Sequence, residues 1–184
     1  MELSGPQWVS RFPTSASVDD LIEPFRSNVA RFIKALRDAH ASVAIADTFR
    51  PPERTYLMHF AFVIARGLDP QTVSPMAGVD IQWVHVGPDG KPDLAASKQA
   101  AARMAQGYGI RFEPALTSRH TERNAIDMTI TWSGDLTIAR ADGTSTIINS
   151  APRTGDNTSL HAVGATFGVI KLVRDPPHWS SDGH

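Results

Sequence analysis

The sequence contains no cysteine, and this absence removes several kinds of chemistry at once. Disulfide bonds, thiolate metal sites and cysteine nucleophiles are all excluded. Any transition metal in this protein must therefore be held by histidine imidazoles and carboxylates, a donor set that suits zinc. Seven histidines are available for that purpose.

Long apolar runs and an excess of one charge sign are also lacking. No stretch approaches the roughly 18 apolar residues that a membrane span needs, and 18 basic residues nearly balance 19 acidic ones. We therefore expect neither nucleic-acid binding nor membrane insertion. Residues 1–17 lack the basic start and apolar segment of a signal peptide, so we expect synthesis in the cytoplasm unless a leader precedes these residues.

The length of 184 residues fits one domain with a substantial core, preceded by residues 1–16 as an N-terminal extension. Apolar spacing predicts helices and strands along the chain. The predicted helices are 17–40, 53–66, 94–106 and 158–167, and the predicted strands are 42–47, 79–86, 125–132, 136–141, 144–148 and 169–173. Because helices come first and an antiparallel meander follows, the order favours an α+β fold with an antiparallel sheet and helices packed on one face.

Asp127 lies on the polar face of the predicted strand 125–132, which is otherwise rich in apolar residues. A carboxylate in the middle of such a strand needs a partner, because burying an unpaired charge is costly. That partner is either an arginine or a metal ion, and the strand pattern alone favours the arginine.

The segment from Arg174 to Trp179 places two prolines between Asp175 and His178. The prolines restrict the backbone, so the segment is either a rigid turn with incidental polar residues or a metal ligand with a carboxylate fixed three residues upstream.

Taken together, these segments resemble the motifs of the LAS-type metallopeptidases. This family includes D-Ala-D-Ala carboxypeptidases, vancomycin-resistance dipeptidases, phage peptidoglycan endopeptidases and the hedgehog signalling domain. The residues that match its motifs, in the family's order, are Phe49-Arg50-Pro51-Pro52, Ser118, His120, Ala125, Asp127, Asp175 and His178. The resemblance covers residues 40–180. It departs from the family at Arg123, where the family has glycine, and at Asp175, where many members have glutamate.

The resemblance implies a hedgehog/DD-peptidase-like fold and one Zn²⁺ per chain, held by the ligands His120, Asp127 and His178. It implies that Asp175 is the general base and acid and that Arg50 shares the negative charge of the oxyanion and contacts the substrate. Ser118 either hydrogen-bonds the substrate or orients His120. The implied reaction is hydrolysis of peptide bonds in peptidoglycan stem peptides or cross-links, as a carboxypeptidase or an endopeptidase. Release by lysis or by a dedicated secretion system would bring such an enzyme to the cell wall, and a cytoplasmic recycling enzyme is the alternative.

Two other function classes remain open from the sequence. One is a catalytically weak, zinc-containing cell-wall-binding module of the same fold, and the other is a metal-free structural protein. The oligomeric state is open as well. Among the secondary residues, we expect Trp132 and His161 to pack in the core. Trp83 and Trp179 are candidates for a cleft, and Asp182 and His184 belong either to a solvated tail or to the surroundings of the metal ligands.

Overall fold

The computed structural model describes residues 1–184, and internal contacts divide the chain into two compact units. Unit 1 comprises Met1–Pro13 and Pro51–Ser118, and unit 2 comprises Thr14–Arg50 and Arg119–His184. The expectation of a single domain over residues 1–184 stays a prediction. The first residues are integrated into unit 1, since Trp8 is 1% exposed in its core.

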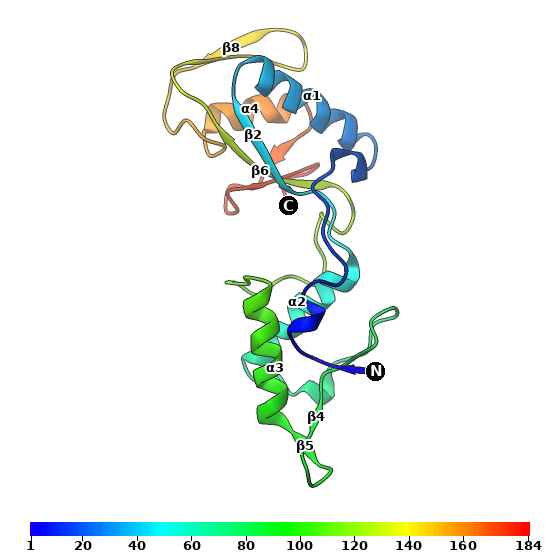
Figure 1. Ribbon diagram of the computed structural model, residues 1–184. Coiled ribbons are helices and arrows are strands. Elements are labelled where there is room, and N and C mark those ends of the chain that lie inside the picture. Colours follow the sequence, from blue (N-terminus) through cyan, green and yellow to red (C-terminus); the bar gives the residue numbers. More distant parts are fainter. The chain divides into compact units, whose positions relative to one another are not determined.

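Unit 2 is built on a four-stranded sheet in which all neighbouring strands are antiparallel (Figure 1). The strand order is β2 (Ser42–Asp47), β6 (Ala125–Thr131), β10 (His178–Ser180) and β9 (Ile170–Lys171). Strand β6 was predicted from alternation, and β2 was predicted as a buried strand because its segment is short, apolar and partly β-branched. Strand β2 forms, but Ser42, Ala44 and Ala46 are exposed. The predicted strand 169–173 is reduced to the two residues of β9, and β10 was not among the predicted strands.

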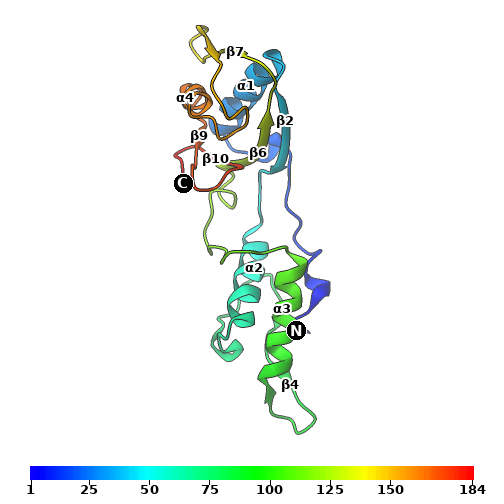
Figure 2. The ribbon, with the colours of Figure 1, turned by 90° about the vertical axis from the view of Figure 1, so that its left-hand side faces the viewer.

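Two helices, α1 (Phe25–Asp38) and α4 (Thr158–Thr166), cover one face of this sheet (Figure 2). The alternation of β6 explains why. Ile126, Met128 and Ile130 are buried in the core with the apolar residues of both helices, whereas Thr129 and Thr131 on the opposite face are exposed. The predicted α+β class with helices on one face of an antiparallel sheet is therefore confirmed for unit 2. A hairpin of β7 (Leu136–Ala139) and β8 (Ser145–Ile148) completes this unit.

The predicted helix from Ser17 begins later than expected. Ser17 caps a short 3-10 helix, Val18–Asp20, and α1 begins only after Pro24. Proline has no N–H and its ring collides with the carbonyl four residues earlier, so a helix cannot run through it and starts beside it instead.

Unit 1 contains two packed helices, α2 (Pro52–Ala65) and α3 (Leu94–Gly107), as the spacing predicted. The predicted strand 79–86 is divided into short pieces. Its pieces are β3 (Ile81–Gln82), which pairs in parallel with β1 (Glu2–Leu3), and β4 (His85–Val86), which pairs with β5 (Pro92–Asp93). The remaining 3-10 helices of this unit are Pro6–Trp8 and Pro70–Thr72.

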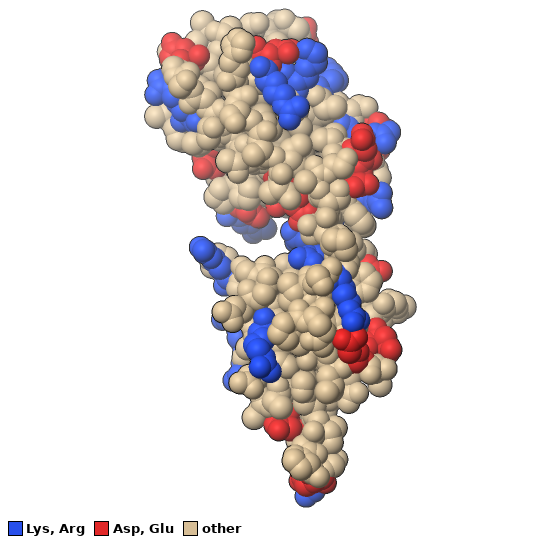
Figure 3. Space-filling model, in the orientation of Figure 1, with Lys and Arg blue, Asp and Glu red and all other residues tan.

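Charged side chains of both signs are interspersed over the face shown in Figure 3. None of the helices combines the length and the apolar character that a membrane crossing requires.

Candidate metal centre

Three of the predicted residues converge in unit 2 on the face of the sheet that the helices leave uncovered. Asp127 on β6 stands directly opposite His178 on β10 in the antiparallel register, and directly opposite residues point to the same face. His120 comes from the turn before β6. The three form a group that can hold a metal ion.

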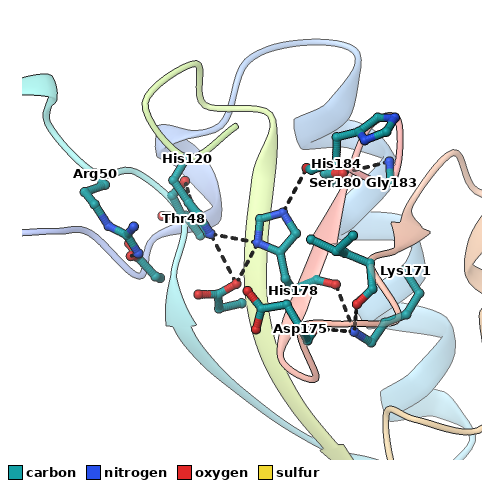
Figure 4. Close-up of polar contacts among 12 residues, drawn as sticks. Thr48, Arg50, His120, Lys171, Asp175, His178, Ser180, Gly183 and His184 are labelled. Carbon is teal, nitrogen blue, oxygen red and sulfur yellow. Dashed lines mark hydrogen bonds and ion pairs between the residues drawn. The ribbon is translucent and has the colours of Figure 1, made fainter. Parts of the chain in front are cut away.

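The ligand atoms of this group form a nearly equilateral triangle (Figure 4). His120 Nε2 lies 3.1 Å from Asp127 Oδ1 and 3.2 Å from His178 Nδ1, and His178 Nδ1 lies 3.1 Å from Asp127 Oδ1. Ligands bound tetrahedrally to zinc at about 2.0–2.1 Å would be separated by roughly 3.3 Å. The triangle therefore has the dimensions of three ligands around one zinc ion.

Main-chain oxygens orient both imidazoles. His178 Nε2 lies 3.1 Å from the main-chain oxygen of His184, and His120 Nδ1 lies 3.4 Å from the carbonyl of Thr48. A carbonyl only accepts, so these nitrogens carry the protons, and the two nitrogens that face Asp127 present lone pairs when the rings are neutral. Three lone-pair atoms at such short distances repel one another unless a cation lies between them. This is the arrangement that outer hydrogen bonds impose on metal-binding histidines.

Asp127 is ionised in this environment. Burial alone would raise the pKa of its carboxyl group, but the contacts with His120 and His178 outweigh burial and hold the pKa well below its usual range. A divalent cation between the three atoms would compensate the charge of this carboxylate. The ion-pair partners of Asp127 are these two histidines rather than the arginine that its strand pattern favoured.

Asp175 lies on the exposed turn between β9 and β10, three residues before His178. The N–H of His178 donates to the carbonyl of Asp175 at 3.0 Å, which closes this turn. The Asp175 side chain extends toward the metal-binding group in Figure 4. The turn thus keeps a solvated carboxylate beside the candidate metal centre.

Arg50 is held at the end of β2 by a contact that the sequence analysis missed. Its Nη2 donates to Oδ2 of Asp47 at 2.7 Å, and its main-chain N–H donates to the carbonyl of His120 at 3.3 Å. Asp47 is 7% exposed, and its other oxygen, Oδ1, is buried without a hydrogen-bond partner. The three-residue spacing of Asp47 and Arg50 could have indicated their ion pair from the sequence. That Asp47 lies opposite Asp127 follows only from the register between β2 and β6.

Ser118 is grouped with unit 1 and is half-buried. Its predicted role in substrate binding stays a prediction, as does the catalytic role of Arg50 and Asp175.

The secondary residues fall mostly in the core. Trp179 and Trp83 are 0% and 5% exposed in the cores of unit 2 and unit 1, so the cleft that was considered for them is wrong. His161 packs edge-on against Trp179, as predicted. Asp182 forms an ion pair with Arg119. This ion pair holds the C-terminal segment, in which the main-chain oxygen of His184 contacts the imidazole of His178.

A hollow of about 390 Å³ lies in unit 2, and none of the three candidate ligands lines it. Its walls are the part of β6 that follows Asp127, the segment 154–156 and the two prolines that precede His178.

Arg123 has the backbone conformation that glycine favours. Its φ is +60°, and its guanidinium carbon lies 4.2 Å from the centre of the Phe49 ring. Glycine adopts a left-handed backbone without strain. Arginine adopts the same conformation at position 123 at a cost of about 1–2 kcal/mol. The side chain stacks on Phe49 and does not contact the three ligand atoms.

Comparison with protein family models, with curated protein sequences and with solved structures found no match to this chain. The function is therefore inferred from the site itself.

We predict that Arg123→Gly and Arg123→Ala differ in stability but not in metal binding. Arg123→Ala should unfold about 1 kcal/mol more easily than Arg123→Gly, because only glycine relieves the left-handed backbone. Urea unfolding measures this difference, and zinc affinity should stay within threefold of the wild type in both variants. Equal stability of the two variants would contradict the account of this position.

Proposed function

We propose that the protein is a zinc-dependent peptidase that hydrolyses peptide bonds in bacterial peptidoglycan stem peptides or cross-links, with unit 2 adopting a hedgehog/DD-peptidase-like fold. The observation that carries the proposal is the 3.1–3.2 Å triangle of His120, Asp127 and His178, which come from the two segments that resemble the family motifs. Three ligands leave one position open, as in catalytic zinc sites.

The residues fit a zinc ion because the donor set is two imidazoles and one carboxylate, without a fourth protein ligand in the group. A bound zinc ion would supply Lewis acidity, which lowers the pKa of a bound water to about 7. Every other part of the reaction is assigned to side chains of this protein.

Asp175 is the proposed general base and acid. Its carboxylate is exposed and lies on a turn closed by hydrogen bonds, so it can accept a proton from the attacking water and deliver it to the leaving amine. Asp is one methylene shorter than the glutamate of many family members, and the short turn between Asp175 and His178 brings its backbone close to the ligands.

Arg50 is the proposed stabiliser of the oxyanion. One of its N–H groups is used by Asp47, and the guanidinium has further donors that can face a developing negative charge. The side chain of Asp47 is 10% exposed and that of Arg50 is 22% exposed. The ion pair is therefore largely shielded from water, and part of the Arg50 side chain remains at the surface.

We predict that zinc binding and turnover can be separated by mutation. His178→Ala should lose both, because it removes a ligand. Asp175→Ala should keep stoichiometric zinc and lose about 10²–10⁴ in kcat, the usual contribution of a general acid–base residue. The measurements are metal analysis and mass spectrometry of defined muropeptides.

Asp135→Ala is the matched control, because Asp135 is an exposed aspartate between β6 and β7 of the same unit. Full turnover by Asp175→Ala would overturn the role of Asp175. Intact muropeptides with the zinc-loaded wild type at pH 6 to 9 would instead support the cell-wall-binding module, and a wild type without zinc would support the metal-free structural protein.

We predict that Arg50→Lys lowers kcat by about 10²-fold, since an ammonium group cannot both contact Asp47 and present a planar set of donors to the oxyanion. KM should change less than threefold, and zinc content should stay unchanged. Steady-state kinetics on the same muropeptides provide the measurement. Unchanged kcat would remove Arg50 from the mechanism.

A further inference from the structure

Lys171 on β9 is a buried lysine whose ammonium group binds only main-chain oxygens. The residue is 6% exposed. Its Nζ donates to the carbonyls of Leu172 at 2.7 Å, Asp175 at 2.5 Å and His178 at 3.1 Å (Figure 4). An ammonium group has three N–H donors, so all of them are used. These bonds compensate the loss of hydration that burial causes.

The three carbonyls belong to the turn that carries the proposed base and one metal ligand. Leu172 begins this turn, Asp175 lies in its middle and His178 ends it. The turn is also closed by main-chain bonds, from Leu172 N–H to His178, from Asp175 N–H to Leu172 and from His178 N–H to Asp175. The ammonium group of Lys171 therefore forms hydrogen bonds with the start, the middle and the end of the turn.

Lys171 does not act as a partner in an ion pair. The carboxylates of Asp156, Asp175 and Asp127 are near enough to influence it, but none lies within salt-bridge distance of its Nζ. Because Lys171 binds the carbonyl of Asp175 and not its side chain, the carboxylate stays exposed to solvent. The lysine thus fixes the backbone of the turn and leaves its functional group available.

We propose that Lys171 is a positioning residue that holds the turn 172–178, and that it thereby sets the metal affinity of the His120–Asp127–His178 group and the placement of the Asp175 carboxylate. The part that concerns Asp175 rests on the proposed peptidase function. The part that concerns metal affinity does not require turnover.

The test is Lys171→Met, which keeps an unbranched side chain, one atom shorter, and removes all three donors. Zinc affinity is measured by competition with a chromophoric chelator, and the visible spectrum of the Co²⁺-substituted protein reports the ligand geometry. We expect zinc affinity to fall 10- to 100-fold, as for other groups that orient metal ligands, together with an altered cobalt spectrum. On muropeptides, kcat should fall more than tenfold while KM changes less than threefold.

Lys34→Met is the matched control, because Lys34 lies in the same unit with its side chain 75% exposed. It should match the wild type in all three measurements. A folded Lys171→Met protein with wild-type zinc affinity and cobalt spectrum would overturn the proposal, even if its melting temperature were lower. A wild type that binds zinc without cleaving muropeptides would refute the peptidase function alone, whereas a wild type that binds no zinc would refute both.

A measurement on the unmutated protein covers the case in which Lys171→Met does not fold. The three hydrogen bonds should slow exchange of the Lys171 ammonium protons with water, so that its ¹⁵N–¹H correlation is observed in nuclear magnetic resonance spectra at neutral pH. The exposed Lys34 ammonium should give none under the same conditions. Absence of the Lys171 signal would overturn the proposal.

Discussion

The register between β6 and β10 is the constraint on which the candidate site depends. Side chains alternate along a strand, so a shift of one residue would turn every side chain of β10 to the opposite face. In the observed register His178 faces Asp127, while Trp179 enters the core beside Phe32 and His161. Trp179 is 0% exposed, and losing such a side chain from a core costs roughly 3–5 kcal/mol. The packing of one tryptophan thus determines the direction in which the adjacent histidine points.

Main-chain atoms, rather than further side chains, organise the rest of the site. The main-chain oxygens of Thr48 and His184 orient the two imidazoles, and three carbonyls of the turn 172–178 surround Lys171. Such contacts hold ligands in place while allowing many different side chains around them. The centre therefore consists of three side chains, those of His120, Asp127 and His178, in surroundings that are fixed mainly by hydrogen bonds to main-chain oxygens.

The sequence was informative where a side chain itself carries the signal. Alternation located β6, and apolar, partly β-branched composition located β2. The resemblance to the metallopeptidases grouped His120, Asp127 and His178 as ligands of one metal ion. It was less informative where the signal lies in the backbone. The two-residue β9 and the three-residue β10 are too short to show a period. The start of α1 after Pro24 could have been predicted from the proline itself. The carbonyl contacts of Lys171 have no counterpart in residue identity, so only the structure could reveal them.

The most direct test of the metal centre is a crystal structure of the zinc-loaded protein, with anomalous diffraction recorded on both sides of the zinc absorption edge. The account predicts a single strong zinc peak per chain, about 2.0–2.2 Å from Nε2 of His120, from a carboxylate oxygen of Asp127 and from Nδ1 of His178. A map without a peak between these three atoms, or with zinc bound only at other residues, would contradict it.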